Sequence, residues 1–358
     1  MSVQFHPLEV IEVRREIADA VSLRLRVPDD LAEAFRYTPG QHLTLRTEIA
    51  GDDIRRNYSI CSAPHEGELR VAIKRVPQGA FSTWANGEIK EGQAIDVMPP
   101  HGSFTWSFDP TREGSYAAFA VGSGITPILS LVKTALREEP QSRVVLLYGN
   151  KTSDSIMFLN EIADLKDRYL DRFQVYHFLT AEEGDIDLFN GRLDADRLQR
   201  VFGTLVDPST LDAAFICGPV VMMDTIEAGL KDAGMPADRI LSERFTSGEL
   251  TKEQRAAMRE LEQGAAGKPI WVTLEGRRRK ITFDPDKESV LENARASGLP
   301  APFACKAGVC ATCRAKVVKG EVRMIQNYGL TEAEVAQGYV LTCQAVPVSD
   351  EVELDFDA

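Results

Sequence analysis

The first hundred residues alternate apolar and polar side chains with a period of two, as strands with one solvated face do. The alternation is clearest over Val21–Val27, Leu43–Arg46 and Leu69–Val76, and glycine-containing turns separate these segments. Short strands joined by such turns favour antiparallel pairing over helix. We therefore expect residues 1–110 to form an antiparallel β-barrel.

From residue 111 onward the pattern changes to short apolar strands that alternate with segments of helical periodicity. This alternation predicts an α/β parallel sheet over residues 111–246, with ligands at the carboxyl ends of the strands. The predicted strands are Tyr116–Val121, Val144–Tyr148, Val175–Leu179 and Ala213–Ile216, and the predicted helices are Ile128–Leu136, Ile156–Tyr169 and Met222–Asp232.

Residues 247–268 are polar and rich in alanine and glycine, which predicts a linker. Within it, Thr251 and Gln254 have the spacing of a capping box before a short helix, Arg255–Leu261. Such a linker allows the domains on either side of it to approach each other.

The last segment, residues 269–358, combines strands with one helix and predicts a small α+β domain of the β-grasp type. Its predicted elements are a hairpin of Ile270–Leu274 and Lys280–Phe283, a helix at Ser289–Ser297 and a closing strand at Val352–Phe356. The basic run Arg277–Lys280 is interpreted as part of a solvated turn, Gly276–Arg279, between the hairpin strands.

The composition and charge of the chain exclude several functional classes. The chain has 358 residues, of which 44% are hydrophobic and 27% charged, so we expect two or three globular domains. A formal net charge of −13 disfavours nucleic acid as a partner. No membrane span or secretory signal is evident, which predicts a cytoplasmic protein. Residues 327–358 carry seven acidic side chains and no Lys or Arg, which suits either a solvated acidic tail or a docking face for a basic partner.

The most specific signal is a cysteine motif near the end of the chain. Cys305, Cys310 and Cys313 stand five and three positions apart in Cys-Lys-Ala-Gly-Val-Cys-Ala-Thr-Cys, and Cys343 follows at a distance. This is the plant-type spacing for a [2Fe–2S] cluster, whereas zinc sites usually pair two Cys-x-x-Cys knuckles. The small residues between the cysteines let backbone N–H groups point at the cluster sulfurs. The sequence therefore predicts single-electron transfer.

Two further motifs suit nucleotide cofactors. On a strand, Arg56 and Tyr58 share one face, and Ser59 follows them. The turn Gly79–Ser82 opens a short helix, whose N–H groups can bind phosphate. A second turn, Gly122-Ser-Gly-Ile-Thr-Pro127, also joins a strand to a helix, and Cys217-Gly218-Pro219 ends a later strand. Together these turns predict phosphate sites in the first two domains.

Arg56-x-Tyr58-Ser59 followed by Gly79-x-x-Ser82 resembles the flavin signature of the ferredoxin–NADP reductase family, and the glycine turn and Cys-Gly-Pro segment fit the same family. The resemblance implies that Arg56 and the Gly79 turn hold the pyrophosphate of FAD, that Tyr58 stacks on the flavin ring, and that Ser59 reaches its reactive nitrogen. This chain departs from the plant-type enzymes, which end in an aromatic residue on the flavin, because it continues beyond Phe245.

Carried over residue by residue, the family pattern implies three sites. The flavin site comprises Arg56, Tyr58, Ser59, Lys74, Val76, Gly79, Phe81 and Ser82, with Phe245 as a flavin neighbour. The nucleotide site comprises Gly122, Ser123, Gly124, Thr126, Pro127, Asn150, Lys151, Cys217, Gly218 and Pro219. Ser59, Thr126 and Cys217 would lie at the reacting rings, and the cluster ligands would be Cys305, Cys310, Cys313 and Cys343. His42 is interpreted as a barrel histidine, and Cys61 as a core residue.

The nucleotide preference follows from the end of the second predicted strand of the α/β domain. An acidic residue there would bind the adenosine ribose hydroxyl and select NADH. After Tyr148-Gly149 come Asn150, Lys151, Thr152 and Ser153, and the first acid is Asp154. We therefore predict NADPH as the donor, with NADH less favoured.

The order of flavin, nucleotide and ferredoxin segments is similar to that of oxygenase reductases. A flavin accepts a hydride and can pass its two electrons singly to an iron–sulfur cluster. Asn327-Tyr-Gly-Leu330 and the ending Asp355-Phe-Asp357 resemble the reductase components that serve a di-iron oxygenase in bacterial phenylacetate degradation. Two alternatives stay open: the reductase of a 3-ketosteroid 9α-hydroxylase or ring-hydroxylating dioxygenase, and a non-catalytic redox sensor, which would need neither a flavin nor a nucleotide site.

Overall fold

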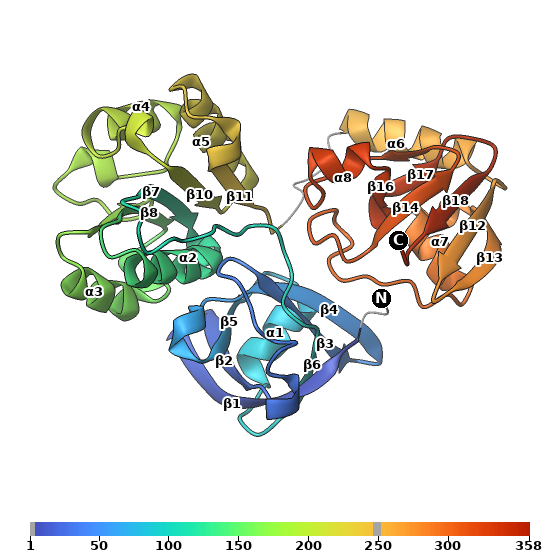
Figure 1. Cartoon of the computed structure of the whole chain (residues 1–358), viewed down its shortest axis with the longest axis horizontal. Coiled ribbons are helices and arrows are strands. Elements are labelled where there is room, and N and C mark those ends of the chain that lie inside the picture. Colours follow the sequence, from blue (N-terminus) through green and yellow to red (C-terminus); the bar gives the residue numbers. More distant parts are fainter. Residues whose placement is uncertain (1–3, 246–251) are drawn as a thin grey trace. The chain divides into compact units, whose positions relative to one another are not determined.

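The computed structural model describes residues 4–245 and 252–358 of the chain. These residues divide into two compact units, one holding nearly all of residues 5–244 and the other holding residues 245–358. The first unit contains a β-barrel and a parallel α/β domain, and the second contains the cysteine motif (Figure 1). Within the described residues, no helix is both long and apolar enough to cross a membrane.

The barrel is a six-stranded antiparallel sheet in the order β4-β3-β6-β1-β2-β5. An isolated bridge between Ile60 and Val71 links the chain just after β4 to β5 and so joins the two outer strands. The interior is apolar, with Leu8, Leu23 and Leu43 fully buried. The elements are β1 His6–Ile17, β2 Ala20–Arg26, β3 His42–Ile49, β4 Asp52–Ser59, β5 Leu69–Lys74, α1 Ala80–Gly87 and β6 Ala94–Val97.

The predicted barrel is therefore confirmed, with shifts at the strand ends. The strand expected over Leu69–Val76 ends at Lys74, and Val76 lies in the following turn with an exposed side chain. Helix α1 begins after Gly79 because Phe81 and Ala85, four positions apart, both face the barrel core.

The α/β domain is a five-stranded, fully parallel sheet in the order β11-β10-β7-β8-β9. Separate apolar clusters fill its two faces: one includes residues of α2 and α3, and the other includes residues of α4 and α5. The elements are β7 Ser115–Val121, α2 Ile125–Glu138, β8 Arg143–Asn150, α3 Leu159–Arg168, β9 Phe173–Leu179, α4 Ala195–Thr204, β10 Ala213–Cys217, α5 Val220–Asp232 and β11 Ile240–Glu243.

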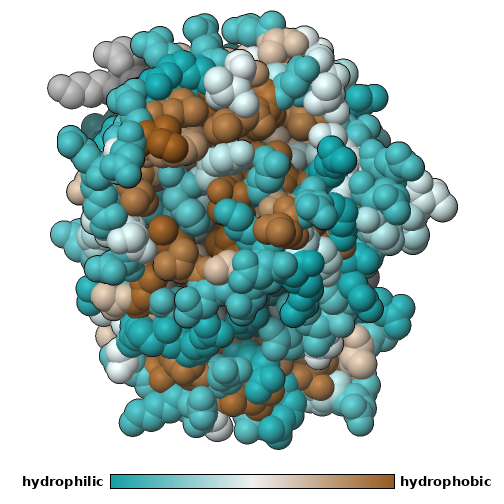
Figure 2. Space-filling view, turned by 90° about the vertical axis from the view of Figure 1, so that its left-hand side faces the viewer, coloured by the Kyte–Doolittle hydropathy of each residue, from teal (hydrophilic) through white to brown (hydrophobic). Residues whose placement is uncertain are grey.

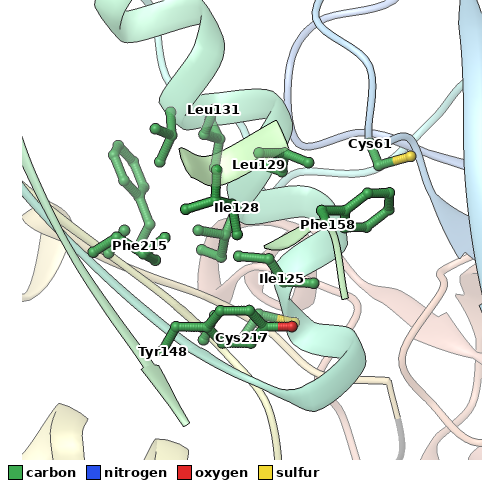
Figure 3. Packing of buried hydrophobic residues seen from close by; sticks show 14 of the residues in the cluster. Cys61, Ile125, Ile128, Leu129, Leu131, Tyr148, Phe158, Phe215 and Cys217 are labelled. Carbon is green, nitrogen blue, oxygen red and sulfur yellow. The ribbon is translucent and has the colours of Figure 1, made fainter. Parts of the chain in front are cut away.

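Helix α2 contributes most of the first cluster. Figure 3 shows Ile125, Ile128 and Leu129 of this helix packed among Tyr148, Phe215 and Cys217 from the sheet. The predicted helix Ile156–Tyr169 begins later than expected, at Leu159, because Ser153–Ser155 forms a short 3-10 turn and Phe158 has a φ of +59°.

Figure 2 shows the side of the molecule that lies on the left in Figure 1. On this side, apolar residues reach the surface in patches among hydrophilic ones. In the α/β domain, the large apolar side chains that are exposed are those of Leu159, Leu170, Ile186 and Val221. Each of these four side chains by itself is an ordinary feature of a protein surface.

The second unit is built on a mixed five-stranded sheet in the order β13-β12-β18-β14-β16, with a separate two-stranded sheet of β15 and β17. Its core lies within residues 265–356. The elements are α6 Lys252–Gly264, β12 Pro269–Leu274, β13 Arg277–Thr282, α7 Val290–Ala296, β14 Arg314–Lys319, β15 Val322–Met324, α8 Glu332–Ala336, β16 Tyr339–Leu341, β17 Ala345–Pro347 and β18 Val352–Asp355. The predicted helix near 255–261 is longer than expected, and Thr251 of the predicted capping box lies outside the described residues.

Shorter 3-10 helices connect many of these elements in both units. They are Asp29–Leu31, Pro64–Glu66, Gly122–Gly124, Ser153–Ser155, Asp187–Phe189, Pro208–Thr210, Ala237–Arg239, Pro285–Lys287 and Thr342–Gln344.

The basic run Arg277–Lys280 lies on strand β13, so its interpretation as part of a solvated turn is wrong. Only Glu275 and Gly276 make the reversal, both with positive φ, as a two-residue hairpin turn requires. Arg278 is not merely solvated, because it donates to both carboxylate oxygens of Glu353 and lies 3.9 Å from the centre of the Trp271 ring.

The acidic residues near the end of the chain are largely engaged inside this unit. Glu334 pairs with Arg314, Glu351 with Lys319 and Glu353 with Arg278. The carboxylate of Asp357 accepts from the backbone N–H groups of the Glu275–Gly276 turn. These acids therefore hold the sheet and its turn together, which neither interpretation of an acidic tail anticipated.

Candidate redox sites

Strand β4 carries the residues expected to bind the flavin. Its alternation places Arg56 and Tyr58 on one face, and Ser59 is turned inward with 3% of its surface exposed. The Tyr58 ring lies 5.4 Å from that of Phe81. Because Phe81 is itself buried in the barrel core, it supports Tyr58 from behind and can offer a ligand only its backbone.

The turn before α1 is held closed by Ser82, whose hydroxyl accepts from the Val76 N–H at 3.0 Å and donates to the Gly79 carbonyl at 3.2 Å. A Cβ on Gly79 would come within 2.6 Å of that hydroxyl, so glycine is needed for this tight turn. Lys74 ends strand β5 beside Asp19, with 3.9 Å between Nζ and the carboxylate. The turn thus leaves its backbone at the start of a helix available for phosphate.

A buried polar cluster lies where the barrel meets the α/β domain. The Ser59 hydroxyl donates to Glu243 Oε2 at 2.6 Å, and Glu243 Oε1 lies 3.5 Å from Nδ1 of His42. The His42 ring packs against that of His101, with 4.2 Å between centroids. Burial, followed by the neighbouring His42, lowers the pKa of His101 to about 3, so this ring is neutral at physiological pH.

The hydrogen bond between Ser59 and Glu243 was not predicted from the sequence. The available signal was its place at the carboxyl end of a strand in the parallel sheet, where ligand-binding groups gather. His42, predicted to be a satisfied barrel histidine, is buried as expected, but its Nε2 has no hydrogen-bond partner among the described residues.

The three segments predicted to bind the nucleotide meet at the carboxyl edge of the parallel sheet. Gly122–Gly124 follows β7, Asn150 ends β8, and Cys217 ends β10. A Cβ on Gly124 would lie 2.1 Å from the Cys217 carbonyl oxygen, so the loops touch only because this residue is glycine. Tyr148 donates to the Gly122 carbonyl at 3.0 Å, an anchor for the loop that sequence reasoning missed.

The other predicted residues of this site line the same edge. The Thr126 hydroxyl donates to the Ser123 carbonyl at 3.0 Å and so stabilises the loop, and Pro127 lies in the first turn of α2. Gly218 and Pro219 lead into α5, and Lys151 follows Asn150 with an exposed side chain. These residues are near one another as predicted, and their contacts with a nucleotide stay a prediction.

Two observations bear on whether this edge suits a nucleotide. The amide of Asn150 is buried, yet neither its nitrogen nor its oxygen has a hydrogen-bond partner within the described part of the chain. Buried amides are normally paired, so this one has capacity for a ligand. Cys217 is fully buried and burial raises the pKa of its thiol, so it stays protonated and is no nucleophile.

The four cysteines of the C-terminal motif come together in two pairs. Cys305 interacts most strongly with Cys310, and Cys313 with Cys343, so that each thiol shifts the pKa of its neighbour. Within each pair the two pKa values move apart: the neighbouring Cys305 lowers the pKa of Cys310 to about 5 while its own rises, and Cys313 lowers the pKa of Cys343 while its own rises. Each pair therefore contains one thiol that readily becomes a thiolate, the form that binds metal.

The loop between these cysteines is shaped to present N–H groups to sulfur. Lys306, Gly308 and Ala311 all have positive φ, and the Ala307 N–H donates to the Cys305 sulfur at 3.3 Å. From the other side, the side-chain amide of Gln344 donates to the Cys343 sulfur at 3.7 Å. Hydrogen bonds of this kind tune the potential of an iron–sulfur cluster.

This donor set fits a dinuclear cluster. Within residues 4–245 and 252–358, no three side chains of His, Cys, Asp or Glu are placed to hold a single metal ion. A [2Fe–2S] cluster does not require that arrangement, because it takes four cysteines, two to each iron. The observed pairing of sulfurs is the one such a cluster needs.

Phe245, predicted as a flavin neighbour, lies two residues beyond the end of β11 and has 40% of its surface exposed. It begins the second compact unit, so its relation to the barrel stays a prediction.

Three protein-family models match the chain in the same order as these sites. Residues 7–106 match the oxidoreductase FAD-binding domain, residues 119–228 the oxidoreductase NAD-binding domain, and residues 272–348 the 2Fe-2S iron-sulfur cluster binding domain. The protein is thus an NAD(P)H-dependent oxidoreductase of the flavin and iron–sulfur class.

The chain belongs to the family of reductase components of multicomponent oxygenases. It is 44% identical over 355 residues to a component of the 1,2-phenylacetyl-CoA epoxidase of Escherichia coli, covering 99% of this chain and 98% of that protein. It is 34% identical to the ferredoxin reductase component of 3-ketosteroid-9-alpha-monooxygenase of Rhodococcus rhodochrous, covering 98% and 96%. Its fold is similar to that of phthalate dioxygenase reductase, with a TM-score of 0.61, 22% identity and 98% of both chains covered.

Proposed function

We propose that this protein is the reductase of a phenylacetyl-CoA epoxidase and passes electrons from NAD(P)H through FAD and a [2Fe–2S] cluster to a di-iron oxygenase component. The observation that carries the proposal is the 44% identity to the epoxidase component, which extends over nearly the full length of both chains. The reductase of the 3-ketosteroid enzyme aligns over a similar length but at 34% identity. We also propose a cytoplasmic location, which suits a chain whose six cysteines are all free.

The barrel would hold FAD through the residues carried over from the family pattern. Arg56 supplies a cation for the pyrophosphate, Tyr58 a ring for stacking, and the Gly79–Ser82 turn backbone N–H groups for phosphate. Bound flavin supplies the ability to take two electrons from a nicotinamide and release them one at a time. Ser59 and Glu243 would then hold a hydroxyl and a carboxylate in fixed positions beside the ring.

The parallel sheet would hold the nucleotide across its carboxyl edge. The Gly122–Thr126 loop and the start of α2 offer N–H groups to a pyrophosphate, and Gly218 lets the nicotinamide half approach the backbone closely. Thr126 and Cys217 would lie near the nicotinamide, where the neutral thiol packs without reacting. Cys305, Cys310, Cys313 and Cys343 would ligate the cluster in the two pairs described above.

The proposal is tested by pairing the purified, reconstituted protein with purified oxygenase components. We expect oxygen consumption that depends on both NADPH and phenylacetyl-CoA when the partner is the oxygenase of a phenylacetyl-CoA epoxidase. A 3-ketosteroid oxygenase serves as the comparison partner. Faster turnover with that partner would transfer the assignment to the second family, and reduction of cytochrome c without turnover by either would point to a different physiological acceptor.

A further inference from the structure

A carboxylate reaches the end of strand β8 from a neighbouring strand, where the linear sequence shows none. Strands β8 and β9 run parallel side by side, and their pairing continues past both strand ends. The Thr180 N–H donates to the Asn150 carbonyl at 3.1 Å, and the Ala181 N–H to the Lys151 carbonyl at 2.8 Å. The next residue, Glu182, therefore lies alongside the segment that follows β8.

Glu182 occupies both hydrogen-bond donors of Ser153. Its Oε1 accepts from the Ser153 backbone N–H at 3.0 Å and from the Ser153 hydroxyl at 3.1 Å. A backbone N–H together with a hydroxyl is the kind of donor pair that binds a phosphate oxygen. The carboxylate thus sits where an added phosphate group would find its partners.

The surroundings of this contact are strongly acidic. The segments 150–155 and 180–187 contain five carboxylates, those of Asp154, Glu182, Glu183, Asp185 and Asp187, but only one ammonium, that of Lys151. Asp187 is paired with Arg200 at 2.8 Å. An anion arriving here meets net repulsion, which is partly screened because the residues are near the surface.

In parallel sheets of this class, the residue at the end of the second strand distinguishes the two nicotinamide cofactors, because the adenosine ribose lies there. We propose that Glu182 is a specificity-determining residue that disfavours a ribose 2′-phosphate by occupying Ser153 and by its charge. The inference rests on the proposed nucleotide site and adds to it a residue that no motif assigns. Glu182 weakens the binding of NADPH and leaves the binding of NADH unchanged.

The sequence predicts NADPH because no acid stands at the end of β8 along the chain. The position of Glu182 in the fold contradicts that reasoning. Along the chain, Asp154 is the first acid after β8, and no earlier acid stands at the end of that strand. Glu182 is 32 positions beyond Asn150 in the chain, and the parallel pairing of β8 with β9 brings it beside the end of β8 despite that separation. Whether NADPH or NADH binds more tightly depends on how far the repulsion by Glu182 outweighs the hydrogen-bond donors of Asn150, Lys151 and Ser153.

The test compares the full-length, flavin-loaded protein with its Glu182→Gln variant. Calorimetry measures the dissociation constants of 2′,5′-ADP, which carries the extra phosphate, and of 5′-ADP, which does not. We expect Glu182→Gln to tighten 2′,5′-ADP by about fivefold, the size of effect typical of one exposed charge contact, and to leave 5′-ADP unchanged. Glu183→Gln removes the same charge from the adjacent residue and is the matched control.

A second pair of variants separates the effect of the Ser153 contact on phosphate binding from the effect of the Glu182 charge. Glu182→Ala removes the accepting oxygen as well as the charge and so frees the Ser153 hydroxyl, and adding Ser153→Ala to it should remove most of the gain for 2′,5′-ADP. Equal effects of Glu182→Gln and Glu183→Gln would overturn the inference, and so would weaker binding of 2′,5′-ADP to Glu182→Gln. If neither ligand bound the wild-type protein, the nucleotide site itself would be wrong, and the inference would fall with it.

Discussion

His101 shows how burial sets the chemistry of a single side chain. Its Nε2 is buried without a hydrogen-bond partner in the described structure, and its ring packs on that of His42. The lowered pKa, about 3, lies below the ordinary histidine value of 6.5. The folded state thus excludes a proton that the unfolded chain binds, so stability is fully present above pH 6.5 and falls as the pH drops from there toward 3.

We expect the urea midpoint of the wild-type protein to fall between pH 7 and pH 5, with this histidine contributing up to about 1.4 kcal/mol per pH unit below 6.5. His101→Gln, which cannot take up the proton, should flatten that part of the pH dependence. The comparison is His65→Gln, at a more exposed histidine whose pKa burial also lowers, which should flatten the pH dependence less than His101→Gln does. An unchanged slope in His101→Gln would show that other groups cause the pH dependence.

At the scale of elements, helix α2 is linked to the barrel through one buried lysine. Lys133 on α2 has 4% of its side chain exposed and contacts the carboxylates of Glu66, at 3.0 Å, and Glu161. Arg70 of β5 donates to the same Glu161 at 3.1 Å, and the Ser130 hydroxyl donates to the Ser62 carbonyl at 2.6 Å. Because α2 begins at the Gly122 loop, this network links the nucleotide loop to the strand region that carries Ser59.

Lys133→Met should lower the free energy of unfolding by about 1–3 kcal/mol, because the partly exposed carboxylates of Glu66 and Glu161 lose the buried ammonium that they share, while Arg70 still pairs with Glu161. Lys166→Met, at an exposed position on α3, is the matched control and should change it by less than about 0.5 kcal/mol. Chemical denaturation of both variants measures the difference. A Lys133→Met effect no larger than that of the control would mean that these ion pairs contribute no net stability.

The elements also show what sequence patterns can and cannot predict. Strand β7, its glycine turn and α2 were predictable because each local signal agrees with the others. Strand β13 was misinterpreted because four basic residues in a row are typical of a turn, whereas the contacts of Arg278 with Trp271 on β12 and Glu353 on β18 exist only in the assembled sheet. Glu182 and Glu243 reach their sites through strand pairing, so no local pattern marks them. The cysteine spacing, by contrast, is read directly from the sequence.

At the scale of the whole molecule, the two compact units have separate cores. The core of the cysteine-bearing unit lies within residues 265–356, and the clusters of the other unit lie within residues 8–241. Apolar burial is the main source of folding stability, so each unit is stabilised by its own residues. Damage to the cluster site should therefore leave the flavin and nucleotide sites folded.

Cys343→Ser tests this separation. Because Cys343 pairs with Cys313 and lies next to Gln344, its loss removes one of four ligands and should abolish the cluster signal in electron paramagnetic resonance. The same protein should still bind FAD and reduce ferricyanide with NADPH at near wild-type rates, while cytochrome c reduction falls by about tenfold or more, as the one-electron route is lost. The control is Cys61→Ala, at a buried cysteine of the barrel, which should keep its iron. Loss of flavin from Cys343→Ser would contradict the separation, because it would mean that the second unit is required to fold the first.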